Sequence, residues 1–218
     1  MNDWNVTAEQ GSARAFHLDD SFSAGDRQVR IFTVQDSALV LGSTQSVDDV
    51  DTAVAQHLMI DVFRRRSGGG AVLLQPNAQL WCDVFITKAD QLWSEDVGVA
   101  SHWLGDVWAE ALGSQGFDDA VVHRGPMQVT VSSSVLCFAG LGPGEVTIDG
   151  AKCVGISQRR TREGARFQCS VPAVWNSELH EQLLGPGLQR VGGDLSALRA
   201  HPVTDSAGLL AAFEAALP

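Results

Sequence analysis

Short runs of β-branched and other hydrophobic residues, separated by polar and turn-forming residues, make up most of the chain. These runs predict strands over residues 29–34, 38–41, 59–63, 71–74 and 81–86, and again over 129–131, 135–138, 146–148, 153–156 and 167–171. Asp149-Gly150 lies between two of the later runs, which predicts a tight hairpin turn there.

Helical periodicity is clearest over residues 96–112. Hydrophobic residues recur there at the i, i+3, i+4, i+7 spacing, and Gly113 follows as a stop signal. Trp103 and Trp108 belong to this hydrophobic face, so we expect both in the core. Weaker patterns predict helices over 47–57, 177–184 and 206–217, with Ser46 capping the first and Asp205 or Ser206 capping the last.

Strands in clusters with helices set between them predict an α+β fold, with a mixed, largely antiparallel sheet flanked by helices. The chain shows no repeat, no low-complexity linker and no boundary, so we expect a single domain over residues 1–218. Hydrophobic residues make up 44% and charged residues 19% of the sequence, which suits a globular protein with a sizeable core.

No window of 18 apolar residues occurs, and Asp3 and Glu9 lie where a secretory signal would be basic and then apolar. We therefore expect a cytoplasmic protein. The net charge of −11 argues against sequence-independent binding to nucleic acid or to an anionic membrane.

The basic residues are unevenly spread. More than half of the 15 lie in residues 64–66 and 152–166. Such clusters indicate either a site for an anionic ligand or a solvated basic face.

The four cysteines form no CxxC pair and have no histidine at zinc-ligand spacing, so we expect neither a structural metal site nor, in the cytoplasm, disulfides. The simplest expectation for Cys82, Cys137, Cys153 and Cys169 is that each is a small buried residue.

The segment RRRSGGGAV, residues 64–72, contains three successive glycines and is predicted to be a loop. Without Cβ atoms, a ligand can lie against main-chain N–H groups that bond phosphate or carboxylate oxygens, while the arginines add charge. The segment is neither a Walker A loop nor a GxGxxG motif. A tight turn without a ligand is the alternative.

Lys152 follows the predicted hairpin turn and precedes Gly155. A lysine at this place can extend its ammonium over the sheet, where it would neutralise an acyl phosphate or polarise an acyl carbonyl. A solvated surface lysine is the alternative.

Together, RRRSGGGAV and the later G-x-K-x-x-G-x-x-Q-R of residues 150–159 resemble the lipoate-protein ligase and octanoyltransferase family, part of the biotin/lipoate protein ligase superfamily. The two motifs occur in the family's order and at about its separation. The segment LVLGSTQ, residues 39–45, is similar to the family's early strand, so the resemblance covers roughly residues 30–172.

The resemblance implies a catalytic domain related in fold to class II aminoacyl-tRNA synthetases, and an enzyme that attaches an octanoyl or lipoyl group to a lysine of a lipoyl carrier domain. The family motifs place Lys152 as a catalytic residue. They place as substrate-binding residues Arg65, Arg66, Ser67, Gly68, Gly69, Gly70, Ala71, Gly155 and Gln158. The family's acyl tunnel would draw on the strands around Val40, Val72 and Val154.

Three features depart from the general family pattern. Leu73-Leu74 stands where family members usually carry a histidine. Too few residues follow Pro172 for the separate C-terminal domain that closes over the adenylate in the long ligases. Cys137 precedes Lys152 in a glycine-rich loop, with the spacing seen where one class of octanoyltransferases carries an acyl-accepting cysteine.

The resemblance leaves three activities open. In the slightly favoured one, octanoyl passes from acyl carrier protein to Cys137 and then to the carrier lysine, with Lys152 favouring the thiolate and no tightly bound cofactor. In the second, ATP and magnesium activate the free acid as an adenylate, and Lys152 holds the acyl-phosphate region. In the third, a non-catalytic relative binds acyl groups or carrier domains.

The implied partners are the lipoyl carrier domains of 2-oxoacid dehydrogenases or the glycine cleavage H protein, with acyl carrier protein as a possible donor. We expect the protein itself to be a monomer.

Overall fold

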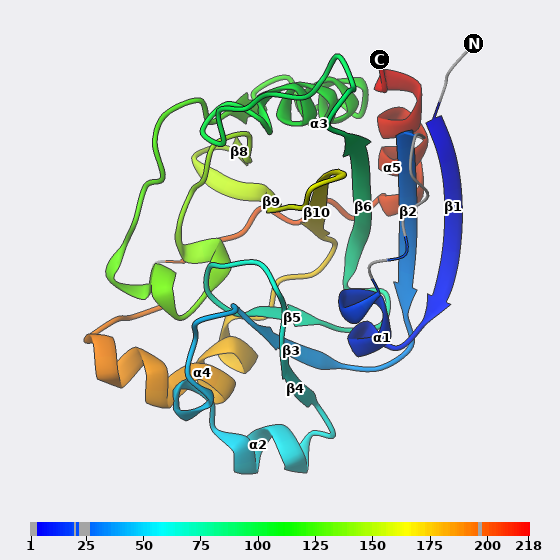
Figure 1. The fold of residues 1–218 in the computed structure, drawn as a ribbon. Helices are drawn as coiled ribbons and strands as arrows, with labels where there is room; N and C mark the ends of the chain where they lie inside the picture. Colours follow the sequence, from blue (N-terminus) through cyan, green and yellow to red (C-terminus); the bar gives the residue numbers. More distant parts are fainter. Residues whose placement is uncertain (1–3, 20, 22–26, 196–197) are drawn as a thin grey trace.

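A seven-stranded sheet forms the larger part of the computed structural model (Figure 1), which describes residues 4–19, 21, 27–195 and 198–218. Its spatial order is β1 (Trp4–Gly11), β2 (Arg27–Val34), β6 (Gln79–Thr87), β10 (Gly164–Pro172), β9 (Ala151–Arg160), β8 (Val146–Ile148) and β7 (Val121–Val122). β1 pairs parallel with β2, and all the other neighbours pair antiparallel. The predicted mixed, largely antiparallel sheet is therefore confirmed.

A second sheet contains three strands, β4 (Asp61–Arg64), β3 (Ala38–Leu41) and β5 (Val72–Leu74), with β3 in the middle. β3 runs parallel to β4 and antiparallel to β5. The short helix α1 (Ala13–Leu18) contributes Phe16 to a hydrophobic cluster that also holds Phe32 and Trp81 of the large sheet and Val40 of the small one. This cluster joins the two sheets.

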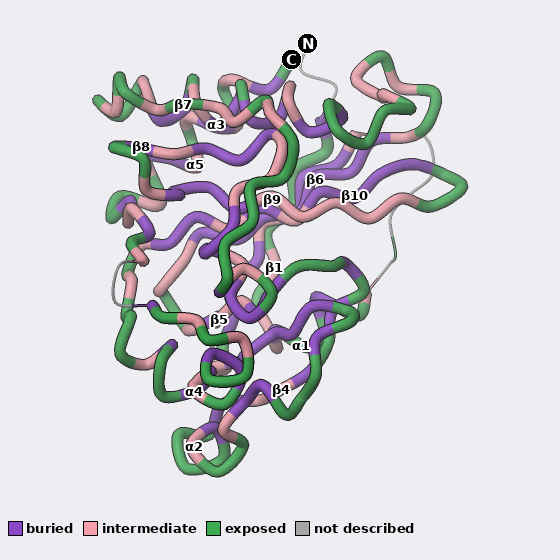
Figure 2. The backbone as a smooth tube through the Cα atoms, turned by 90° about the vertical axis from the view of Figure 1, so that its left-hand side faces the viewer, coloured by how far each residue is buried: buried purple, intermediate pink, exposed green. Residues whose placement is uncertain are grey.

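Helices cover both sheets. α3 (His102–Ser114) and α5 (Ser206–Ala216) share a core with the large sheet, in which Trp108 stacks on Phe213 at 4.1 Å between ring centroids. α2 (Thr52–His57) and α4 (Ser177–Val191) pack against the small sheet. Figure 2 shows the buried backbone concentrated in the strands, with exposed segments at the outer loops and at α2.

The predicted strands of the first half and of residues 146–171 are confirmed, as is the turn at Asp149-Gly150, where both residues have positive φ. The Asp205 side chain accepts a hydrogen bond from the Gly208 N–H and caps α5, as predicted. Trp108 is fully buried, and Trp103 is partly buried against the same core.

The single helix predicted over 47–57 is divided. A 3-10 turn covers Val47–Asp49, capped by Ser46, and α2 begins afresh at Thr52. The Asp51 carboxylate accepts hydrogen bonds from the N–H groups of Ala53 and Val54, so it starts a second helix inside the predicted one.

Two other helices have different limits from those predicted. α3 begins at His102, since residues 96–101 form turns in which the Asp96 carboxylate accepts from the Gly98 N–H. α4 continues through Pro186 to Val191 and ends at Gly192, which adopts φ 65°.

The strands predicted over 129–131 and 135–138 are wrong. Val131 belongs to the 3-10 turn η2 (Val131–Ser134), Cys137 and Phe138 belong to η3 (Cys137–Ala139), and the other residues of the two segments lie in no strand. Thr130 and Ser133 exchange side-chain and main-chain hydrogen bonds in a capping box, which stabilises the turn over an extended strand. In addition, β1 and α1 are present in a part of the chain for which the sequence pattern predicted no helix or strand.

Within the described ranges, no helix combines the length and the apolar character needed to cross a lipid bilayer.

Candidate active site

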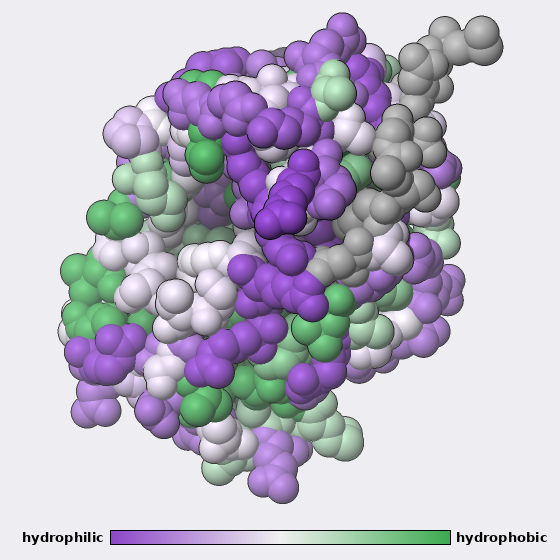
Figure 3. Space-filling model, in the orientation of Figure 1, coloured by the Kyte–Doolittle hydropathy of each residue, from purple (hydrophilic) through white to green (hydrophobic). Residues whose placement is uncertain are grey.

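A cleft of about 520 Å³ opens between the glycine loop of residues 65–70, the segment of residues 126–145 and the strand β9. Both predicted motif segments contribute to its walls, together with Cys137 and Glu145. The cleft appears as the hollow between the upper and lower parts of the face in Figure 3.

The glycine loop presents main chain to this cleft. The Arg65 guanidinium donates from Nη2 to the carbonyl oxygens of Gly68 (2.8 Å) and Gly70 (3.0 Å), which fixes the curve of the loop. In the described part of the chain, no acceptor takes a hydrogen bond from the N–H groups of Gly68, Gly69 or Gly70. These donors are therefore available to an anionic or carbonyl group in the cleft.

Glycine is required at two of these positions for different reasons. Gly69 has φ 95°, a conformation that L-amino acids with a side chain rarely adopt. A Cβ atom on Gly70 would lie 2.6 Å from main-chain atoms of Leu136. The next residue, Ala71, donates to the Val135 carbonyl and accepts from the Cys137 N–H, so the glycine loop is packed directly on the segment that carries Cys137.

Cys137 begins η3 and is half-buried, whereas Cys82, Cys153 and Cys169 are buried. It lines the cleft and also a neighbouring pocket, which we call the apolar pocket. That pocket is lined by His17, Arg65, Val72, Leu74, Trp81, Cys137, Phe138, Gly155, Ile156, Ser157, Gln168, Cys169 and Ser170. Because Arg65, Cys137, Ile156 and Ser157 line both spaces, Cys137 lies at their junction.

Lys152 is 4% exposed, so it is not a solvated lysine. Its ammonium forms an ion pair with Glu145 Oε2 at 2.6 Å and donates to the carbonyl oxygens of Cys137 (3.1 Å) and Gly140 (3.2 Å). Burial by itself lowers the lysine pKa, but the Glu145 carboxylate outweighs burial and leaves the pKa raised. Lys152 therefore stays charged and binds the loop that carries Cys137.

The sequence interpretation missed Glu145. Its carboxylate accepts from the N–H of Gly142 at 2.6 Å and from the N–H of Ile156 at 3.0 Å, in addition to the ammonium of Lys152. It thereby fastens the Cys137 loop to β9. The only signal in the sequence was one acidic residue in a glycine-rich segment, which does not identify a partner.

The other predicted substrate-binding residues differ in their positions. Ser67 and Gln158 line the cleft, and Gly155 lines the apolar pocket. The Ser67 hydroxyl lies 3.2 Å from that of Ser157, and the buried Nε2 of Gln158 has no hydrogen-bond partner in the described residues. Arg66 is exposed and lines neither space.

Ala71 is fully buried in the hydrophobic core behind the loop. Of the three valines expected near an acyl tunnel, Val72 lines the apolar pocket. Val40 and Val154 are instead fully buried in core clusters.

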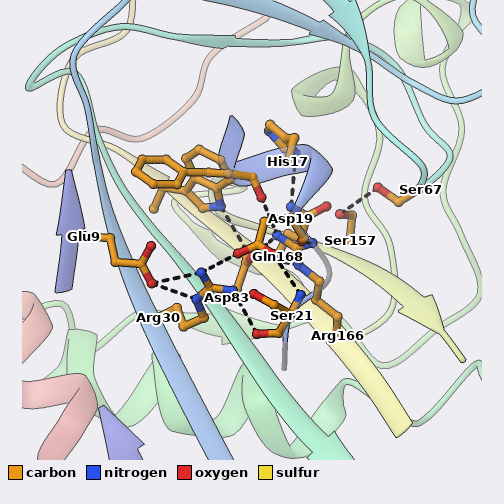
Figure 4. Close-up of polar contacts among 12 residues, drawn as sticks. Glu9, His17, Asp19, Ser21, Arg30, Ser67, Asp83, Ser157, Arg166 and Gln168 are labelled. Carbon is orange, nitrogen blue, oxygen red and sulfur yellow. Dashed lines mark hydrogen bonds and ion pairs between the residues drawn. The ribbon is translucent and has the colours of Figure 1, made fainter. Parts of the chain in front are cut away.

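Three of the clustered arginines, Arg64, Arg160 and Arg166, bind other segments of the fold. Arg166 forms a buried ion pair with Asp83 and donates to the carbonyl oxygens of Phe16 and Asp19, as Figure 4 shows for the carboxylate. Arg160 donates to the carbonyls of Ser94 and Glu95, and Arg64 to that of Gln45.

A histidine borders the apolar pocket from a place that the sequence did not suggest. Leu74 occupies the core at the position of the expected histidine, whereas His17 of α1 stacks on Trp81 at 4.5 Å. Gln168 donates to its Nδ1 at 3.1 Å (Figure 4). Burial, followed by the charges of Arg65 and Arg166, holds the His17 pKa well below its usual value, so the ring is neutral.

Among the described residues, no three His, Cys, Asp or Glu side chains are grouped in a way that could hold a metal ion.

Comparisons with known proteins agree on the kind of domain. The family model of the lipoyl protein ligase A/B catalytic domain matches residues 14–190. The octanoyltransferase LipM of Clostridioides difficile (strain 630) is 24% identical over 177 residues, which cover 77% of this chain and 64% of that protein. The chain thus matches somewhat less than two thirds of this relative's length.

Solved structures show the same fold. The bi-partite lipoate protein ligase from Thermoplasma acidophilum, studied together with its E2 lipoyl domain, superimposes with a TM-score of 0.69 at 14% identity, covering 100% of this chain and 84% of that chain. A lipoate-protein ligase A bound with ATP superimposes with a TM-score of 0.64 at 13% identity, covering 97% and 94%.

Proposed function

This chain belongs to the lipoyl protein ligase A/B catalytic domain family, and we propose that it is an octanoyltransferase. It would move an eight-carbon acyl group from acyl carrier protein to Cys137 and then to the lysine of a lipoyl carrier domain. The observation that carries the proposal is the position of Cys137, a half-buried thiol at the junction of a cleft and an apolar pocket.

In the first step, the Cys137 thiolate attacks the carbonyl carbon of the octanoyl thioester. The carrier thiol leaves with the proton that Cys137 lost, and the octanoyl group becomes a thioester on Cys137. The apolar pocket would take the hydrocarbon chain, while the unpaired N–H groups of Gly68–Gly70 would stabilise the negative oxygen of the tetrahedral intermediate.

In the second step, the neutral amine of the carrier lysine attacks the Cys137 thioester. An amide forms, the thiolate of Cys137 is released, and the proton from the amine returns to the thiol. The wide cleft, which Cys137 also lines, leaves room for a lysine side chain to reach the thioester. Lipoyl domains of 2-oxoacid dehydrogenases and the glycine cleavage H protein are the proposed acceptors.

Lys152 would assist mainly by holding Cys137. Its ammonium bonds the Cys137 carbonyl itself, and the negative charge of Glu145 offsets most of its field. Its part in the reaction is thus first to orient the nucleophile and second to favour negative charge near the thiol.

An ATP-dependent ligase is the second candidate, favoured by the unpaired donors of the glycine loop. The N–H groups of Gly68–Gly70 and the buried Gln158 amide suit phosphate oxygens, so these residues would hold the nucleotide. ATP, with magnesium, would activate the free acid as an adenylate.

Mass measurement tests the first proposal directly. After incubation with octanoyl-acyl carrier protein alone, the protein should gain one octanoyl group that hydroxylamine removes, and Cys137→Ser should gain none. Cys153→Ser is the matched control: burial raises the pKa of the Cys153 thiol to about 12, so this thiol is unreactive and its variant should still be acylated. An adduct that survives in Cys137→Ser would refute the Cys137 intermediate.

A second incubation separates the candidates. If the lipoyl carrier domain is acylated only in the presence of octanoate, ATP and magnesium, and if Cys137→Ser acylates it as fast as the parent, the protein is a ligase. If the carrier domain is acylated in neither mixture, both enzymatic activities are refuted, and the remaining interpretation is a non-catalytic protein that binds acyl groups or carrier domains.

A further inference from the structure

A second hollow lies next to the apolar pocket, on the side of α4. Leu136, Trp175 and His180 form part of its wall, and we call it the Trp175 hollow. The Trp175 ring stacks on the His180 ring at 4.3 Å, and the His180 Nδ1–H donates to the Asn176 carbonyl. Of the residues in the two sequence motifs, Val72 alone lines this hollow, and the proposed reaction does not use the hollow.

The two spaces share part of their walls, which we call the partition. Val72, Phe138 and Ser170 line both of them. Phe138 is the largest of the three, and it is 6% exposed. The apolar pocket has a volume of about 40 Å³ and the Trp175 hollow about 30 Å³, so the two spaces are similar in size.

The Phe138 ring is held in place from several sides. A Cβ atom built on Gly155 would meet the tip of the ring at 3.5 Å, an ordinary van der Waals contact, so the ring lies close to the main chain of β9. The Lys152 ammonium lies 5.0 Å from the ring centroid, and the Trp175 ring lies 5.4 Å away. An aromatic ring packed in this way is a fixed wall and not a mobile side chain.

We propose that Phe138 sets the length of acyl chain that this protein accepts, by closing the apolar pocket against the Trp175 hollow. The inference rests on the proposed function, since it takes the apolar pocket as the site of the acyl chain. A chain that starts at Cys137 and fills the apolar pocket meets the Phe138 wall, and a longer chain has no further apolar space. Removing the ring joins the two spaces and gives the additional methylene groups a place out of water.

The test compares octanoyl and dodecanoyl donors with the same protein. The parent should load octanoyl onto Cys137 faster than dodecanoyl, and Phe138→Ala should raise the dodecanoyl-to-octanoyl rate ratio by at least about tenfold, because each buried methylene favours the longer chain severalfold. The ratio is measured within one variant, so a general loss of reactivity beside Cys137 cancels. Val72→Ala, which thins the same partition, should shift the ratio in the same direction and serves if Phe138→Ala fails to fold.

Two matched controls locate the effect in the partition. Leu73→Ala shortens a side chain that lines only the Trp175 hollow and should leave the ratio within twofold of the parent. Ala78→Leu, introduced together with Phe138→Ala, should fill the Trp175 hollow and return the ratio towards that of the parent. An unchanged ratio in folded Phe138→Ala and Val72→Ala would overturn the inference.

A binding measurement keeps this inference distinct from the proposed transfer. Octanoate and dodecanoate can be titrated into the Cys137→Ser protein, with and without Phe138→Ala, and followed by tryptophan fluorescence, since Trp81 and Trp175 each line one of the two spaces. A gain in dodecanoate affinity with Phe138→Ala supports the partition even if no acyl group is transferred. Equal affinities in both proteins would refute the partition even if transfer occurs.

Discussion

The Lys152 ammonium has three hydrogen atoms to donate, and one loop supplies acceptors for all of them. Glu145, the Cys137 carbonyl and the Gly140 carbonyl all belong to residues 137–145. An acyl carbonyl in the cleft could bond this ammonium only by displacing one of them. At the scale of the residue, Lys152 therefore does as much to position Cys137, the proposed nucleophile, as to supply charge.

Replacing Lys152 with methionine should reduce acyl transfer about 10²–10³-fold, since both the charge and the hold on Cys137 are lost. The buried Glu145 carboxylate would be left unpaired, so the free energy of unfolding should also fall by about 3–5 kcal/mol. Transfer assays and urea denaturation measure the two effects.

The double variant Lys152→Met/Glu145→Gln separates the effect on stability from the effect on transfer. It removes the unpaired charge and should regain part of the stability without regaining transfer, although the glutamine amide can accept only one of the two main-chain N–H bonds that the carboxylate accepts. Lys88→Met is the control, since Lys88 is the only other lysine and its side chain is 56% exposed. Transfer within twofold of the parent in Lys152→Met would exclude Lys152 from the reaction.

At the scale of the element, the glycine loop of residues 65–70 and the segment of residues 135–145 that carries Cys137 behave as one unit. They exchange main-chain hydrogen bonds through Ala71, and Gly70 lies against Leu136 with no room for a side chain. The absence of a Cβ thus serves packing at Gly70 and backbone conformation at Gly69, while the N–H groups of both remain free for a ligand.

Gly70→Ala should therefore displace Cys137 and slow its acylation by about tenfold or more, with a loss of about 1–3 kcal/mol in the free energy of unfolding. Gly113→Ala in α3 is the matched control: a Cβ there meets open space, so the helix should gain about 0.5–1 kcal/mol and acylation should not change. The rate of octanoyl adduct formation is the measurement. If Gly70→Ala is acylated at the parent rate, the loop does not position Cys137.

At the scale of the whole molecule, two buried histidines lie at distant points of the fold and make its stability depend on pH. His17 of α1 packs on Trp81 and His180 of α4 packs on Trp175. Burial lowers the pKa of both rings, with help from the charges of Arg65 and Arg166 at His17. The folded protein therefore takes up these protons at lower pH than the unfolded chain does.

The stabilisation from these neutral rings is fully present above about pH 6.5, the ordinary histidine pKa, and it is lost as the pH falls below that value towards the folded pKa. We expect the free energy of unfolding to drop between pH 6.5 and 5 by up to about 1.4 kcal/mol per pH unit for each histidine. Urea denaturation at several pH values measures this slope. The single variants His17→Gln and His180→Gln should each reduce it, and the double variant should reduce it most; an equally steep slope in the double variant would contradict the prediction.

Much of the fold could be predicted because local patterns decide it. The strands around residues 29–41 and 146–171 and the turn at Asp149-Gly150 follow from alternation and turn chemistry. The failures also have local causes that hydrophobic patterns do not show. Asp51 starts a new helix inside a helical period, and the capping box of Thr130 and Ser133 turns a valine-rich segment away from the extended conformation.

For the candidate site, the sequence predicted which motif residues meet and did not predict their partners. The glycine loop, Lys152 and Cys137 do meet at one cleft. The pairing of Lys152 with Glu145, and the use of Arg166 to bind Asp83 and α1, were not readable from the sequence. His17 reaches the apolar pocket from a helix that the sequence pattern did not predict.

The sequence by itself determined the α+β architecture, the glycine loop and the identity of the two motifs, because backbone preference, periodicity and motif spacing act over a few residues at a time. Only the tertiary structure decided which charges neutralise each other, which cysteine remains accessible and that the Phe138 ring lines both the apolar pocket and the Trp175 hollow. These outcomes depend on desolvation and packing between segments far apart in the chain, such as Asp83 with Arg166 and Phe138 with Trp175.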